Sequence, residues 1–241
     1  MIPSLQPIFQ GPWARYGETL ALTSEDTKAF PVKLLLTEKD LLNEILNRHA
    51  KYLGVRDPRP VASSWLLSYC TALLPPIVAA TTLLQLSLPV GINDLKVELN
   101  IADEPAVFYI DNEGDLLIGD TYDRYHKLIW ENLSPLIKHL SDHSRIPAKV
   151  LWGNVARRLE PIFEQALIFA DTHAPSSVRE DFEKLLFTRL WNNDFRNPLY
   201  QLQKTSIKKI PAIKLHRQCC LFHLIPNEGY CDACPLSPKN L

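Results

Sequence analysis

Glycine is scarce in this chain, and the glycine-rich loops that cradle phosphates are missing. Only 8 of the 241 residues are glycine. The sequence has no Gly-x-Gly-x-x-Gly, Gly-x-x-x-x-Gly-Lys-Ser/Thr, Gly-x-Ser-x-Gly or His-Glu-x-x-His pattern, which are typical of dinucleotide sites, nucleotide-binding loops, serine hydrolases and zinc proteases. We therefore expect neither a nicotinamide nor a flavin to bind by the usual route. Any electron that the protein uses must then come from another protein or a soluble carrier.

An excess of charge of either sign is also missing. The chain has 26 Lys and Arg residues against 27 Asp and Glu residues, which argues against a general nucleic-acid binder. The charge is unevenly spread, because residues 201–241 hold six Lys or Arg and two acidic residues, whereas the rest of the chain is net negative. A solvated basic segment is the simplest interpretation, but this segment also holds four of the five cysteines.

Residues 60–93 lack charge altogether, which raises the question of a membrane span. The pair Pro75-Pro76 interrupts this run, so we expect two buried helices, 61–74 and 76–88, and no span. Cys70 is expected to be a small core residue. The N-terminus does not resemble a secretion signal. We therefore expect a cytoplasmic protein that can lie against the inner face of the cytoplasmic membrane.

Helical periodicity dominates the rest of the chain, with one stretch of strand periodicity. The expected helices are 41–53, 122–140, 147–170 and 177 to about 194, and the expected strands are 95–101, 106–110 and 116–118, the last two forming a hairpin. Residues 1–36 are expected to be irregular, anchored by Trp13 and Phe30. The predicted fold class is α+β, mainly helical, with a small antiparallel sheet. We expect a helical domain over 1–200 on the substrate side and a short cysteine-rich cluster-binding segment over 201–241.

The cysteines of that segment follow the spacing Cys-Cys-x10-Cys-x2-Cys, formed by Cys219, Cys220, Cys231 and Cys234. Two cysteine pairs at the ends of one loop can assemble four thiolates around a small inorganic centre. A disulfide between the adjacent cysteines would be strained, because neighbouring Cα atoms lie about 3.8 Å apart. A structural zinc site explains Cys231-x2-Cys234, but zinc sites usually separate paired ligands by two to four residues. The spacing favours an iron–sulfur centre and leaves zinc and disulfides as alternatives.

This spacing, with Arg217 before the cysteine pair and Pro235 after the last cysteine, resembles the C-terminal motif of the FhuF-type ferric siderophore reductases. The match covers about the last 25 residues, and a weaker similarity covers residues 151–154. The resemblance implies a [2Fe-2S] centre held by Cys219, Cys220, Cys231 and Cys234. It also implies one-electron reduction of siderophore-bound Fe(III) to Fe(II), which anionic oxygen ligands hold less tightly, so that the iron is released.

The resemblance also implies partners, namely a ferric siderophore of the hydroxamate type and an external electron donor. Arg217, Lys214 and His216 are candidates for facing the substrate or tuning the reduction potential. Asn154 is a candidate pocket residue, although Gly153-Asn154 is more simply a helix kink. The rival hypothesis is a zinc-stapled siderophore-binding or interaction module without redox activity. Siderophore synthetases, some of which share a FhuF-like region, are a second alternative, but they need nucleotide-binding chemistry that this sequence does not show.

Overall fold

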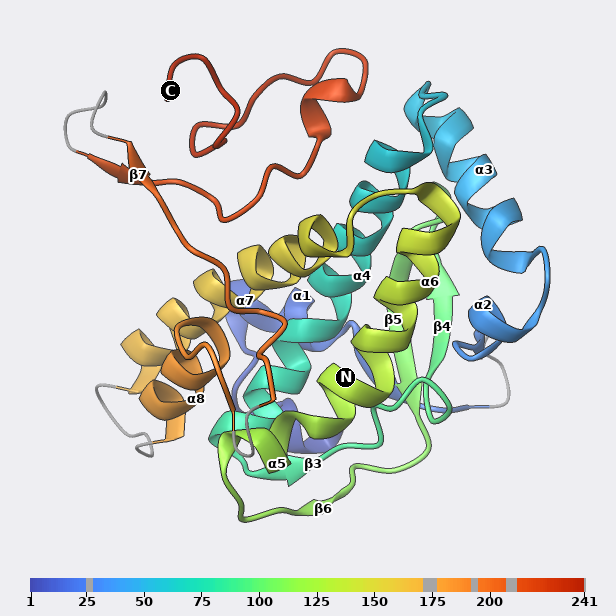
Figure 1. Ribbon diagram of the computed structural model, residues 1–241. Helices are drawn as coiled ribbons and strands as arrows, with labels where there is room; N and C mark the ends of the chain where they lie inside the picture. Colours follow the sequence, from blue (N-terminus) through green and yellow to red (C-terminus); the bar gives the residue numbers. More distant parts are fainter. Residues whose placement is uncertain (25–27, 171–176, 192–194, 207–211, 241) are drawn as a thin grey trace.

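The computed structural model describes residues 1–24, 28–170, 177–191, 195–206 and 212–240 (Figure 1). Its central element is helix α4, Pro58–Val78, which continues directly into a π-helical turn at Ala79–Leu83. The helix crosses the middle of the molecule and packs against α7 (Ala148–Ala170), α3 (Leu41–Leu53), α6 (Ser134–Ser144) and strand β5 (Pro105–Ile110) (Figure 1). It is long and apolar enough to span a membrane, but 83% of its most apolar window is buried inside the protein. The helix therefore forms the core.

The expectation of two helices over this stretch was wrong, because Pro75 and Pro76 lie inside one continuous helix. A proline within a helix costs about 3 kcal/mol. Each buried Leu or Ile side chain contributes about 1.5–3 kcal/mol, and Leu73, Leu74 and Ile77 around the proline pair are almost completely buried. Burial on every side of the helix thus offsets the local cost of the prolines.

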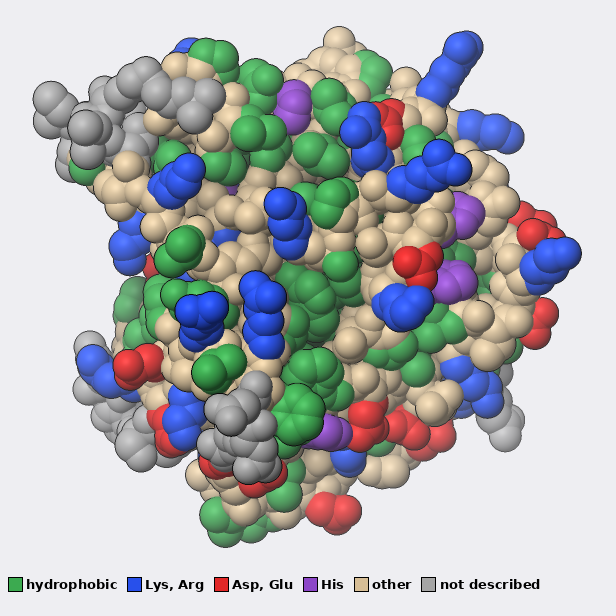
Figure 2. All heavy atoms as spheres, in the orientation of Figure 1, with side chains coloured by type: hydrophobic (Ala, Val, Ile, Leu, Met, Phe, Trp, Pro, Cys, Tyr) green, Lys and Arg blue, Asp and Glu red, His purple; other side chains and the backbone are tan. Residues whose placement is uncertain are grey.

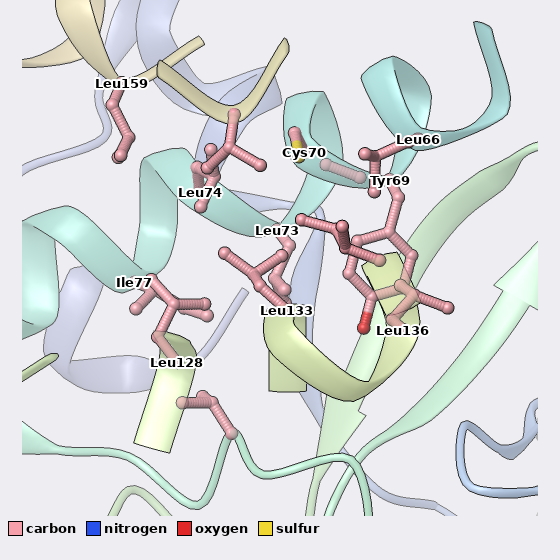
Figure 3. Packing of buried hydrophobic residues seen from close by; sticks show 14 of the residues in the cluster. Leu66, Tyr69, Cys70, Leu73, Leu74, Ile77, Leu128, Leu133, Leu136 and Leu159 are labelled. Carbon is pink, nitrogen blue, oxygen red and sulfur yellow. The ribbon is translucent and has the colours of Figure 1, made fainter. Parts of the chain in front are cut away.

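The core around α4 is built mainly from aliphatic side chains, with aromatic ones such as Tyr69 and one cysteine (Figure 3). Leu73 of α4 and Leu133 of the neighbouring helical segment pack together in this view. Cys70 is fully buried among them, and burial raises the pKa of its thiol to about 12. The prediction of Cys70 as a core residue is confirmed.

The main sheet has four short strands in the order β1-β5-β4-β2. Their bounds are Leu20–Leu22 for β1, Pro105–Ile110 for β5, Lys96–Leu99 for β4 and Phe30–Pro31 for β2. β1 runs parallel to β5 and the other pairs are antiparallel, so the sheet is mixed where an antiparallel one was expected. The N-terminal region, which was expected to be irregular, supplies both edge strands. The sequence did not predict them, because strands of two or three residues are too short to show a period.

The N-terminal region also holds three single turns of helix, at Pro3–Leu5, Gly11–Trp13 and α1, Ala14–Gly17. The prediction that Trp13 anchors this region is wrong, since 47% of its surface is exposed. Ile2, Leu5 and Leu20 are fully buried instead. Phe30 packs against the core as expected.

The predicted hairpin between 106–110 and 116–118 is wrong. β6, Asp115–Leu116, pairs with β3, Leu86–Ser87, while β5 forms its hairpin with β4. The turn that redirects the chain contains Gly114 at φ +67°, where a Cβ atom would lie 2.1 Å from the carbonyl oxygen of Ser87. Only glycine allows this approach.

Except for α2, which begins in the region that was expected to be irregular, the remaining helices agree well with the predicted periodicity. They are α2, Leu34–Thr37; α3, Leu41–Leu53; α5, Thr121–His126; a π-helical turn, Lys127–Leu133; α6, Ser134–Ser144; α7, Ala148–Ala170; and α8, Ser177–Leu186. α3 ends at Gly54 in the left-handed conformation, as expected. α8 ends earlier than predicted, because the Asn197 side-chain amide donates to the carbonyl oxygens of Lys184, Leu185 and Thr188. The predicted end near 192–194 lies outside the described residues.

The C-terminal part contains β7, Thr205–Ser206, paired with β8, Ile213–Lys214, and a 3-10 turn at Phe222–Leu224. This segment passes over one end of α4 and α7 (Figure 1). The predicted fold class is confirmed: the protein is mainly helical, with small sheets and a cysteine-containing C-terminal segment. The division into domains at residue 200 stays a prediction.

Candidate metal centre

Two arms of the C-terminal segment bring the cysteines together. The backbone N–H of His216 donates to the carbonyl oxygen of Ala233 at 2.8 Å, which joins the arm before Cys219 to the arm before Cys234. The sulfur atoms of Cys219 and Cys234 lie 3.5 Å apart. Two ligands of one tetrahedral metal with metal–sulfur bonds of about 2.3 Å are separated by about 3.7 Å. This pair therefore has nearly the separation that metal coordination needs.

The four loop thiols differ in their exposure to solvent. Cys219, Cys220 and Cys234 are buried, whereas Cys231 is exposed. Burial raises the pKa of the Cys219 thiol to about 12 and also raises the pKa of Cys231, on which the charges of Cys220 and Cys234 act as well. All four thiols thus share one neighbourhood. A metal must displace their protons to bind, so loading the site would release protons.

The four cysteine sulfurs, arranged as two pairs along the loop, are the kind of ligand set that an iron–sulfur centre needs. Within the described ranges, no three Cys, His, Asp or Glu side chains already converge on a single point as a mononuclear metal site. The Cys219–Cys234 pair is close to ligand geometry, and the other two thiols must turn towards it. Four cysteines spread over a loop in this way can serve a centre with two metal atoms, in which each iron takes two thiolates.

The sulfur of Cys219 receives two further polar contacts. The backbone N–H of Leu221 lies 3.4 Å from it, and His223 Nδ1 lies 3.6 Å from it. The His223 ring stacks on Tyr230 with the ring centres 4.5 Å apart. Hydrogen bonds to a ligating sulfur are known to influence the potential of iron–sulfur centres.

The cysteine loop rests on residues from α4 and α7. The hydroxyl of Ser63 donates to the carbonyl oxygen of Cys220 at 2.6 Å, and the Asn154 amide donates to Ser63 Oγ at 2.7 Å. Asn154 is fully buried. It therefore supports the loop through Ser63, a residue that carries no sequence signal of its own.

Gly153 and Arg157 of α7 hold the neighbouring residue, Gln218. A Cβ atom on Gly153 would lie 2.8 Å from Gln218 Cβ, so glycine permits the close approach of the loop to the helix. One guanidinium nitrogen of Arg157 donates to the Gln218 carbonyl oxygen at 3.1 Å. Gly153 remains within a regular helix, and close packing rather than a kink explains it.

The three predicted tuning residues lie in different environments. Arg217 is buried, forms an ion pair with Glu160 at 2.8 Å and lies over the Phe187 ring. Burial, with a smaller contribution from Arg157, lowers the pKa of His216 to about 4, so this ring is neutral at pH 7. Lys214 is exposed on β8. Roles for all three in binding substrate or tuning the potential stay predictions.

A cavity of about 770 Å³ opens beside the cysteine loop, and Cys219 forms part of its wall. Its basic lining residues are Lys149, Arg189, Arg196, Lys204, His216 and Arg217, and no acidic residue of the described chain lines it. Figure 2 shows Lys and Arg side chains spread over the face between the C-terminal segment and α8, where few acidic side chains lie. His216 and Arg217 were candidates from the sequence, but Lys149, Arg189 and Arg196 gave no signal, because they lie outside the cysteine-rich segment.

Two family models match the chain. The model described as ferric iron reductase FhuF-like transporter matches residues 63–207, which is more than half of the chain. The model described as FhuF 2Fe-2S C-terminal domain matches residues 217–236, which contain all four cysteines of the loop. No curated protein matches the chain.

The solved structures that are similar come from a larger protein. The ATP-bound aerobactin synthetase IucA from a hypervirulent pathotype of Klebsiella pneumoniae superposes with a TM-score of 0.58 at 16% identity, over 72% of this chain and 37% of that one. Another structure of the same synthetase gives a TM-score of 0.53 at 16% identity, over 66% and 34%. The chain thus spans about a third of the synthetase. The similarity establishes a shared fold and no shared activity.

Proposed function

This chain belongs to the family of FhuF-like ferric iron reductase transporters, and on that premise we propose that it is a ferric siderophore reductase. In this proposal Cys219, Cys220, Cys231 and Cys234 hold a [2Fe-2S] centre, which accepts and donates single electrons. The observation that supports the proposal most strongly is the position of Cys219. Its side chain lines a basic cavity while its sulfur lies 3.5 Å from that of Cys234.

The charge of the cavity suits the proposed substrate. A ferric siderophore holds Fe(III) with anionic oxygen atoms, and many such complexes have a net negative charge. Lys149, Arg189, Arg196 and Lys204 line the cavity without an acidic neighbour in its described wall. These side chains are exposed. They attract an anionic complex electrostatically, and added salt should weaken this attraction.

The reaction in this proposal is the transfer of one electron to the chelated iron. An external one-electron donor, either a protein or a soluble carrier, reduces the cysteine centre. The centre then reduces Fe(III) to Fe(II), and no bond of the organic ligand breaks. Fe(II) has less charge, so the same oxygen atoms hold it less tightly and it can leave. We further propose the cytoplasm as the compartment and a hydroxamate-type complex as substrate. Three hydroxamates only balance the charge of Fe(III), so the basic cavity favours a hydroxamate siderophore that also has free carboxylate groups.

A single-turnover experiment tests this function. The protein is reduced anaerobically, the reductant is removed, and a ferric hydroxamate complex is added together with a chelator that forms a coloured complex with Fe(II). We expect about one Fe(II) per reduced centre, formed as the visible spectrum of the centre returns to the oxidised form. A reduced centre that persists while no Fe(II) forms would exclude this activity.

Charge variants of the cavity sharpen the test. Arg189→Gln and Arg196→Gln should weaken the binding of an anionic ferric complex several-fold, and should do so less at high salt. Arg56→Gln removes an exposed arginine that lines neither this cavity nor the cysteine loop and serves as the matched control. Equal losses in all three variants would contradict a role for the cavity.

A further inference from the structure

A second cavity, of about 550 Å³, lies where α1, α4, the start of β5 and α7 meet. It shares no lining residue with the cavity beside Cys219. The side chains of its wall that can form hydrogen bonds or ion pairs are those of Arg15, Tyr16, Thr19, Ser68, Thr71, Glu104 and Arg158, and the Thr19 hydroxyl already donates to the carbonyl oxygens of Tyr16 and Ala72. The family matches and the proposed reductase activity assign no role to it.

Arg158 is the unusual residue of this wall. Its side chain is half-buried, and its Nε atom is shielded from solvent without a hydrogen-bond partner. In the part of the chain that the structure describes, no carboxylate forms an ion pair with it. Burial is the largest influence on its pKa, which is lowered. A half-buried cation without a counter-ion costs free energy, and its guanidinium fork matches the oxygen atoms of a carboxylate or phosphate.

The other polar groups leave room for one anion. Arg15 is exposed, and its guanidinium donates to the Tyr16 hydroxyl at 2.8 Å. Glu104 is the only carboxylate of the described wall, and it accepts hydrogen bonds from Ser68 Oγ at 2.9 Å and Asn100 Nδ2 at 3.2 Å. The hydroxyl of Thr71 donates to the Leu67 carbonyl oxygen within α4. The donors that remain available are the two guanidinium groups and the Tyr16 hydroxyl, which only accepts in its bond with Arg15.

Arg158 also connects this cavity with the cysteine loop. Arg158 directly follows Arg157 in α7, and the guanidinium of Arg157 donates to the carbonyl oxygen of Gln218, two residues before Cys220. Cys220 belongs to the loop that is proposed to bind the centre, and it lies near enough to influence the pKa of Arg158. An anion bound to Arg158 would cancel part of the positive charge near Cys220. Because reduction adds negative charge to the centre, this anion would make reduction less favourable.

We propose that this cavity binds a small oxyanion, through a carboxylate or phosphate group, between Arg158 and Arg15, and that the bound anion lowers the reduction potential of the cysteine centre. The proposed binding of the anion does not depend on the reductase function, whereas the proposed effect on the reduction potential rests on that function. Occupancy of the site by a metabolite with such a group would then regulate how readily the protein accepts an electron.

Calorimetric titration of the full-length protein tests the binding, with inorganic phosphate in one series and acetate in the other to distinguish the two chemical groups. We expect one saturable site for at least one anion. Arg158→Gln should weaken it about tenfold or more, since a charged hydrogen-bonding pair is lost. Arg158→Lys should retain part of the affinity, and Arg56→Gln should retain all of it. Absence of saturable heat with both anions, or unchanged affinity in Arg158→Gln, would overturn the proposal.

Redox titration of the iron-loaded protein tests the coupling. A saturating anion should lower the potential of the wild-type protein, whereas Arg158→Gln should start from a lower potential and respond to no anion. Another outcome is a lower reduction potential in Arg158→Gln while neither the wild type nor any variant binds an anion. Arg158 would then influence the potential of the centre through its own charge only, and the proposed anion site would be overturned. Iron and sulfide analysis of the same samples reports on the reductase proposal separately.

Discussion

Ser63 and Cys220 lie 157 positions apart in the sequence, yet the Ser63 hydroxyl donates a hydrogen bond of 2.6 Å to the Cys220 carbonyl oxygen. Asn154 in turn donates to Ser63 at 2.7 Å, so a chain of two buried hydrogen bonds runs from α7 through α4 to the cysteine loop. The loop is therefore tied to the two longest helices of the core. Its geometry depends on residues outside the cysteine motif.

Ser63→Ala should loosen the cysteine loop. Leaving the Cys220 carbonyl oxygen and the Asn154 amide without their partner should cost about 1–3 kcal/mol of unfolding free energy. We expect iron and sulfide to be lost faster from the variant than from the wild type. Ser144→Ala is the matched control, since Ser144 is equally buried and donates to Leu140 at 2.6 Å within α6, far along the chain from the loop. Equal iron retention in Ser63→Ala and the wild type would contradict the role of Ser63.

Gly153→Ala should displace the loop from α7. The new Cβ would lie 2.8 Å from Gln218 Cβ, which is closer than real Cβ contacts, and overpacking of this kind costs about 1–3 kcal/mol. Denaturant unfolding and iron content measure the effect. The double variant Gly153→Ala/Gln218→Gly should recover stability, because it removes the Cβ atom that the new alanine would meet. Gly229→Ala provides a control within the loop, because nothing lies within 4 Å of its Cβ position. A Gly153→Ala protein that equals this control would refute the packing argument.

Cys70 should take no part in the metal centre. Its thiol is fully buried and its pKa is raised to about 12, so it should resist alkylation by iodoacetamide in the folded protein and react only after unfolding. In the metal-free protein, Cys231 is exposed and should react first among the five cysteines. Peptide mass spectrometry distinguishes the sites. Cys70→Ala should retain the iron of the wild type, and loss of iron there would contradict this assignment.

Asp57 gives a prediction about pH. Its carboxylate caps α4 by accepting from the backbone N–H of Arg59 at 2.9 Å, and the hydrogen bond from the Arg59 side chain lowers the pKa of Asp57 below its usual 3.8. A lowered pKa stabilises the fold above pH 3.8 and loses this effect as the pH falls through the lowered value. Asp57→Ala should thus cost about 1 kcal/mol at pH 7. The difference from the wild type should shrink below pH 3.8 in denaturant titrations, and a constant difference would count against the cap.

The long helices of this fold were predictable from periodicity, and the short strands were not. The apolar spacing of α3 and α7 located both helices to within a few residues. The strands β1 and β2 have two or three residues each, and their partners lie far away in the chain. The Pro75-Pro76 pair also misled the prediction, because only the packed core reveals that burial outweighs the local cost of proline.

In the candidate site, too, some residues could be predicted from the sequence and others could not. The four cysteines could be identified from their spacing, since ligands on one loop leave a local pattern. Ser63, Arg157 and the cavity residues Lys149, Arg189 and Arg196 could not, because they reach the loop only through tertiary structure. Arg217 was named from its position beside the cysteines, and its role towards the substrate stays a prediction, but its ion pair with Glu160 and its place in the cavity wall could be seen only in the structure.

The central claim is that the four loop cysteines hold a redox-active [2Fe-2S] centre. The most direct measurement is iron and acid-labile sulfide analysis of anaerobically purified protein, followed by electron paramagnetic resonance after reduction with dithionite. The account predicts two irons and two sulfides per chain, a signal from one unpaired electron after reduction, and loss of all three in Cys231→Ser. One zinc per chain with neither sulfide nor signal would contradict it, and the loop would then be a structural zinc site.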